Sequence, residues 1–136
     1  METQFDMRLV SPAPARVRAR LRYSPATPLV VEIIFDLGEE FAPVTWTLGR
    51  DLLRDGLSAP AGMGDAQIGL TAPESRTLLL GLYSPGGSAE FRLPRQALGD
   101  FLRSTAKLVP YGREEEAPGF LASLDRALAS MLAETR

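Results

Sequence analysis

The strongest constraint on the fold is a strictly alternating segment near residue 20. From residue 16 to residue 23, apolar or aromatic side chains alternate with arginines. An alternation of period two places the two kinds of side chain on opposite faces of a β-strand. The first set is Val17, Ala19, Leu21 and Tyr23, and the second set is Arg16, Arg18, Arg20 and Arg22. The segment therefore predicts a strand with one face in a hydrophobic core and the other face in solvent.

Further strand patterns follow one another along the chain without long helices between them. We expect strands near residues 5–9, 16–23, 29–37, 44–48 and 66–70, and a hairpin formed by 76–83 and 88–93. The run 29–37 is almost continuously apolar and β-branched, which is typical of an interior strand. Because the strands do not alternate with crossover helices, the pattern favours an α+β fold with antiparallel sheets.

Three helical segments are also expected. A short one opens at Asp51, whose carboxylate suits a positive helix N-terminus, and Gly56 stands where a left-handed cap would end it. Two longer helices, after Pro94 and after Pro118, carry apolar stripes at helical spacing. The stripes are Leu98, Phe101, Leu102 and Thr105 in the first, and Leu121, Leu124, Leu128 and Met131 in the second. The 136 residues fit one domain with C-terminal helices.

Composition limits the chemistry that the chain can perform. It has no His and no Cys, so Ser-His-Asp and Cys-His catalysis, disulfides and ordinary zinc sites are all ruled out. Its net charge of −2 gives no bulk attraction to nucleic acid or to acidic membranes. The polar start and the lack of an apolar run of ~20 residues predict a soluble cytoplasmic protein without membrane insertion. We expect no catalytic residue, no cofactor and no metal, and therefore not an enzyme.

Some motifs allow a binding interpretation beside a structural one. Gly62-Met63-Gly64-Asp65 could cradle a phosphate, but a tight turn between helix and strand is favoured. Trp46 could stack on a base, but its alternating strand favours a place in the core. Glu114-Glu115-Glu116 could bind a hard cation, but consecutive carboxylates seldom converge on one ion, so a solvated linker is favoured.

The arginine row leaves two interpretations open. It could bind the backbone of a single-stranded nucleic acid, or it could be neutralised by acids on the next strand. We favour the second, because the chain is acidic and no aromatic residue interleaves the arginines. If Tyr23 lies opposite Leu29, Arg20 faces Glu32 and Arg16 faces Asp36.

A set of motifs in a fixed order links the chain to a known family. They comprise a Trp-containing strand, an Arg-Asp-Leu-Leu helix and a Gly-x-Gly-Asp turn, joined by Leu21-Arg22-Tyr23, Ser84-Pro85-Gly86 and Val109-Pro110-Tyr111-Gly112. The motif residues are Trp46, Arg50, Asp51, Leu52, Leu53, Gly56, Gly64 and Asp65. Over nearly its whole length the chain resembles the SsgA-like proteins of actinobacteria. Leu48-Gly49 stands where Phe-Ala is common in that family, which leaves the branch open.

The resemblance implies both a fold and a function. It implies a single SsgA-like domain over residues 1–136, with a Whirly-like architecture of curved antiparallel sheets assembled as a homotrimer. The motif residues then have a mainly structural role. The family acts in sporulation and septation, and its SsgB-like branch recruits the division protein FtsZ to the septum. We expect a non-enzymatic adaptor at the division septum whose partners are itself, FtsZ or another SsgA-like protein. The alternative is a single-stranded nucleic-acid-binding protein with a Whirly-like fold.

Overall fold

The computed structural model describes residues 1–72, 74–117, 120, 121, 125, 128 and 129. Seven antiparallel strands form one sheet in the order β4-β3-β2-β1-β7-β6-β5. The strands are β1 (Glu2–Ser11), β2 (Ala15–Arg22), β3 (Val30–Asp36), β4 (Val44–Gly49), β5 (Ala66–Leu70), β6 (Thr77–Ser84) and β7 (Gly87–Pro94). The helices are α1 (Arg50–Gly56), α2 (Arg95–Leu108) and the short 3-10 helix η1 (Glu114–Glu116).

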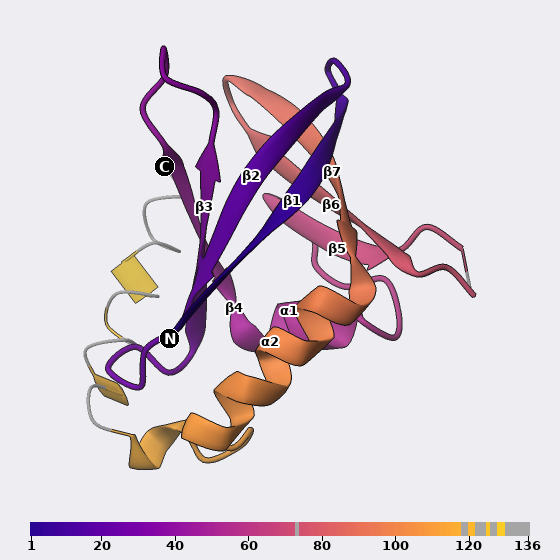
Figure 1. Ribbon diagram of the computed structural model, residues 1–136. Coiled ribbons are helices and arrows are strands. Elements are labelled where there is room, and N and C mark those ends of the chain that lie inside the picture. Colours follow the sequence, from indigo (N-terminus) through magenta and orange to yellow (C-terminus); the bar gives the residue numbers. More distant parts are fainter. Residues whose placement is uncertain (73, 118–119, 122–124, 126–127, 130–136) are drawn as a thin grey trace.

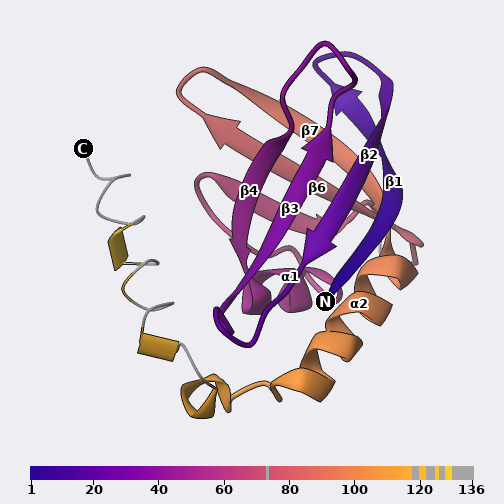
Figure 2. The same ribbon diagram turned by 60° about the vertical axis from the view of Figure 1, so that its left-hand side comes forward.

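The sheet curls so strongly that its inner face encloses the core (Figure 1). Helices α1 and α2 lie at one end of the curl, while the turns β1–β2, β3–β4 and β6–β7 lie at the other end (Figures 1 and 2). Leu53 of α1 and Leu98, Phe101 and Leu102 of α2 are buried in the core. Helices α1 and α2 therefore close one end of the curled sheet, and neither of them covers the hairpin end.

The alternation in β2 determines which face of the sheet is inside. Val17, Ala19, Leu21 and Tyr23 are all at most 4% exposed, as the sequence predicts. Fully burying an aliphatic or aromatic side chain of this size contributes ~1.5–3 kcal/mol. Strand β3 lies between β2 and β4, so its predicted interior position is also confirmed. The fold is α+β with antiparallel strands, while the Whirly-like comparison stays a prediction.

The register between β2 and β3 differs from the predicted one by two residues. Arg22, not Arg20, lies opposite Glu32, and Arg18, not Arg16, lies opposite Asp36. The connection between the strands accounts for the shift, because the Thr27 N–H donates to the Ser24 carbonyl in an extra turn. A shift of two residues preserves the faces, so the acids still lie on the side of the arginines.

The predicted C-terminal helix lies partly outside the described residues. Leu124 and Met131 of its apolar stripe are among the residues that are not described. Leu121 and Leu128 are described and helical, and they are 73% and 48% exposed. None of the helices within the described part of the chain combines the length and apolar character needed to cross a membrane.

Candidate functional site

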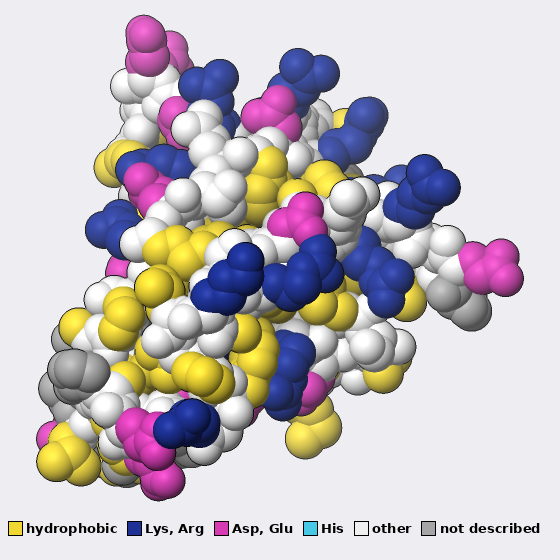
Figure 3. Space-filling model, turned by 60° about the horizontal axis from the view of Figure 1, so that its bottom comes forward, with side chains coloured by type: hydrophobic (Ala, Val, Ile, Leu, Met, Phe, Trp, Pro, Cys, Tyr) yellow, Lys and Arg dark blue, Asp and Glu magenta, His cyan; other side chains and the backbone are white. Residues whose placement is uncertain are grey.

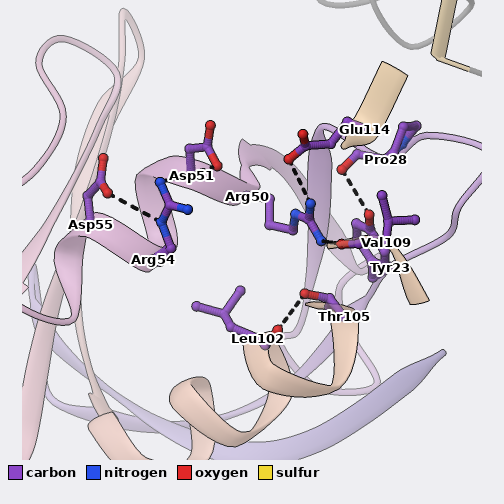
Figure 4. Close-up of polar contacts among 10 residues, drawn as sticks. All are labelled: Tyr23, Pro28, Arg50, Asp51, Arg54, Asp55, Leu102, Thr105, Val109 and Glu114. Carbon is purple, nitrogen blue, oxygen red and sulfur yellow. Dashed lines mark hydrogen bonds and ion pairs between the residues drawn. The ribbon is translucent and has the colours of Figure 1, made fainter. Parts of the chain in front are cut away.

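The motif that follows β4 is built around a buried arginine at the start of α1. Arg50 is 1% exposed, and its Nη2 lies 2.7 Å from Oε1 of Glu114 in η1 (Figure 4). Its Nη1 donates to the Val109 carbonyl, just beyond α2, at 2.6 Å. A buried guanidinium requires a counter-charge and hydrogen-bond acceptors, and both are supplied by the chain after α2.

Two tyrosine rings complete the surroundings of this guanidinium. Its carbon lies 5.1 Å from the centre of the Tyr23 ring and 4.2 Å from that of Tyr111. The Arg54 guanidinium also lies over Tyr111, at 4.3 Å. The Tyr23 hydroxyl donates to the Pro28 carbonyl at 2.9 Å. We call Arg50, Glu114, Tyr23 and Tyr111 the arginine latch, because they join β2, α1 and the segment after α2.

Three groups around the Arg50 guanidinium, Glu114, Tyr23 and Tyr111, have shifted pKa values. Burial alone would raise the pKa of Glu114, but the hydrogen bond and charge of Arg50 outweigh it, and the pKa falls below its ordinary value. Burial raises the pKa of Tyr23, against the opposing charge of Arg50. Burial likewise raises the pKa of Tyr111. The ion pair is thus charged at neutral pH and both phenols are protonated.

The arginine latch corrects the predicted role of the triple-glutamate segment. The sequence favours a solvated linker, yet Glu114 is only 8% exposed. Glu115 is exposed, as expected of a linker, and Glu116 pairs with Arg113 at 2.7 Å. Sequence reasoning misses Glu114 because its partner lies 64 positions earlier. One signal was available, since an arginine at the first position of a helix faces the positive helix end and needs a compensating partner.

The remaining motif residues lie on α1 and the turn after it. Leu53 is buried and Leu52 is half-buried, while Asp51 is exposed and pairs with Arg54 at 3.7 Å. Gly64 has a φ of +81°, which fits the predicted tight turn. The backbone carbonyl of the next residue, Asp65, accepts from the Tyr83 N–H at 2.8 Å. Gly64 and Asp65 thus form the turn, while the mainly structural role of the whole motif stays a prediction.

Gly56 has a different role from the predicted one. It is the last residue of α1 and has no positive φ, so it is not a left-handed cap. Gly56 is required for close packing, because a Cβ built there would lie 2.4 Å from Cγ2 of Ile68 in β5. The absence of a side chain lets α1 approach the sheet.

The candidate interaction surface is an apolar groove at the open, hairpin end of the curled sheet. The groove measures about 340 Å³, and the stacked rings of Phe35 and Phe91, with centres 4.6 Å apart, both line it. Trp46 also lines the groove, and it is half-buried where the sequence favours a full place in the core. Leu37 lines the groove as well and is 41% exposed. Apolar groups that converge in a concavity are typical of a binding site.

The arginine row lies on the outer face of β2, away from this groove. Arg18 faces Asp6 of β1 on one side and Asp36 of β3 on the other. Arg20 forms an ion pair with Glu2 of β1 at 3.4 Å, and not with Glu32. Arg22 lies between Glu2 and Glu32 in the register. Arg16 differs, because its partner in β1 is Arg8.

The described residues contain no cluster of three or more Asp and Glu side chains able to hold a metal ion. What the structure presents is a small α+β domain on a curled antiparallel sheet, with a buried arginine latch at one end and an apolar groove at the other. The chain belongs to the family described as Streptomyces sporulation and cell division protein, SsgA, whose model matches residues 17–114.

Related proteins and solved structures show which members of the family the chain is similar to. It is 40% identical over 135 residues to the sporulation-specific cell division protein SsgB of Salinispora tropica, covering 95% of this chain and 93% of that one. It is 36% identical to SsgB of Streptomyces coelicolor, covering 97% and 95%. The structure resembles the SsgA-like sporulation-specific cell division protein of Thermobifida fusca with a TM-score of 0.78 and 29% identity, covering 100% and 95%. These likenesses support a role in cell division during sporulation.

Proposed function

We propose that the chain is a non-enzymatic adaptor that recruits FtsZ to the division septum in the cytoplasm through protein contacts. The observation that carries the proposal is the apolar groove beside β4, in a family of sporulation cell division proteins. Trp46 and Leu37 both line the groove and retain exposed surface. Apolar surface of this kind is usually covered by a partner.

The surroundings of the groove suit an extended polypeptide. Strand β4 is an edge of the sheet and pairs with β3 alone among the described strands. An edge strand offers N–H and C=O groups to an added strand, while neighbouring pockets receive its alternate side chains. Glu39 and Glu40 in the β3–β4 turn are exposed and favour basic residues in the partner. The occupant we propose is an extended apolar segment of FtsZ flanked by basic residues.

We also propose that the protein assembles as a homotrimer. The support is the family resemblance, together with large apolar side chains on the surface such as Leu108, which is 50% exposed. Sedimentation velocity at micromolar protomer concentration should give a species of three chains. A monomer at that concentration would contradict the assembly without affecting the adaptor proposal.

Co-sedimentation with FtsZ polymers near physiological salt tests the adaptor function. The chain should pellet with the polymers and stay in solution without them. Trp46 is the sole tryptophan and lines the groove, so its fluorescence should shift when FtsZ binds there. A filter-binding assay with single-stranded DNA is the counter-test. DNA retention without FtsZ binding would favour the nucleic-acid alternative, against which the acids around Arg18, Arg20 and Arg22 argue.

A further inference from the structure

The outer face of the sheet brings like charges into direct register. Arg8 of β1 lies opposite Arg16 of β2 on one side and opposite Arg92 of β7 on the other. Neighbouring strands lie ~4.8 Å apart, so the three side chains form a row across the sheet. Like charges directly opposite each other are unfavourable, and an anion between them would relieve the repulsion.

These arginines line a hollow in the surface. Arg8, Arg16, Arg76 and Arg92 border a cleft of about 580 Å³. Arg76 also borders a second hollow of about 690 Å³ near the start of α2, which Arg95 and Arg103 line as well. Figure 3 shows Lys and Arg side chains in a band across the face that carries α2. We call the first hollow, with its four arginines, the arginine cleft.

Within the described part of the chain, the arginines of this cleft have no acid close enough for an ion pair. The ion pairs found there involve none of Arg8, Arg16, Arg76 and Arg92. Arg18 and Arg22 are also absent from these ion pairs, but each has an acid opposite on both neighbouring strands, whereas Arg8 has an arginine opposite on both. The strand register therefore sets acids beside Arg18 and Arg22 of the arginine row and an arginine beside Arg16.

We propose that the arginine cleft binds an acidic segment of a partner polypeptide. Guanidinium groups match carboxylates in paired hydrogen bonds, and closely spaced arginines suit successive Asp or Glu side chains. No aromatic side chain borders either hollow in the described chain, so nothing there would stack on nucleic-acid bases. The cleft is separate from the apolar groove, so the inference does not depend on FtsZ binding.

Fluorescence anisotropy of a labelled polyglutamate peptide, titrated with the full chain at low and near-physiological salt, tests the proposal. The double variant Arg8→Gln/Arg92→Gln should bind on the order of tenfold more weakly, because it removes two charge-assisted contacts. The control is Arg18→Gln/Arg22→Gln, which changes the net charge equally on the same face but outside the cleft. The control should bind as the wild type does, and both variants should keep the wild-type circular dichroism spectrum.

Three results would overturn the proposal. Absence of peptide binding at low salt would show that the cleft is no acidic-segment site. Equal weakening in both double variants would show that net charge, and not the cleft, attracts the peptide. Tighter binding of oligo-dT than of polyglutamate, lost in Arg8→Gln/Arg92→Gln, would assign the cleft to nucleic acid.

Discussion

Removing Glu114 is the sharpest perturbation of the arginine latch. Glu114→Ala leaves the Arg50 guanidinium, 1% exposed, without its counter-charge. Breaking a buried ion pair from one side costs ~3–5 kcal/mol. The Val109 carbonyl and the tyrosine rings remain, and the Glu114 side chain is 10% exposed, so water can reach the gap. We therefore expect Glu114→Ala to lower the free energy of unfolding by about 3 kcal/mol, the lower end of that range.

Urea and thermal unfolding followed by circular dichroism, at one fixed protomer concentration, measure this loss. The melting temperature should fall by roughly 10 °C for a domain of this size. The matched control is Glu115→Ala, the exposed neighbour, which should change the free energy of unfolding by less than ~0.5 kcal/mol. If Glu114→Ala and Glu115→Ala unfold alike, the latch does not stabilise the fold and the reasoning is wrong.

The remaining predictions concern packing, the groove and pH. Gly56→Ala should destabilise by ~1–3 kcal/mol in urea unfolding because its Cβ has no room, whereas Gly99→Ala in α2, with open space, should stabilise by ~0.5–1 kcal/mol. Trp46→Ala should lower the free energy of unfolding by about 2 kcal/mol. This is less than the ~3–5 kcal/mol lost when a fully buried aromatic side chain is truncated to alanine. In acid titrations the wild type should lose stability as pH falls below about 4.5, through the lowered pKa of Glu114, and Glu114→Ala should lose less.

Local patterns in the sequence predicted the elements and the faces of the sheet. The alternation at residues 16–23 gave the correct inward and outward sides, because the period of a strand survives any even shift of register. It could not give the register itself. That depends on how many residues the connection from Tyr23 to Leu29 uses, and its turn at Ser24 to Thr27 uses more than a simple hairpin would.

The functional features escaped prediction because they depend on distant contacts. Glu114 looks solvated among its neighbours, and its burial follows from the path that the chain takes after α2. Arg8 and Arg92 meet only because β1 pairs with β7 as well as with β2, and no local pattern indicates that pairing. Trp46 packs against the core, but it lines the groove at the hairpin end and is only partly buried there.

The adaptor function is tested most directly by an FtsZ co-sedimentation isotherm with matched surface variants. Leu37→Asp puts a charge in the lining of the groove, and Met63→Asp makes the same change at an exposed site on the turn after α1. The wild type and Met63→Asp should bind alike, and Leu37→Asp about tenfold more weakly, since burying a leucine contributes ~1.5–3 kcal/mol. Sedimentation velocity must show the same assembly for all three. Wild-type protein that stays in the supernatant at every polymer concentration would contradict the account.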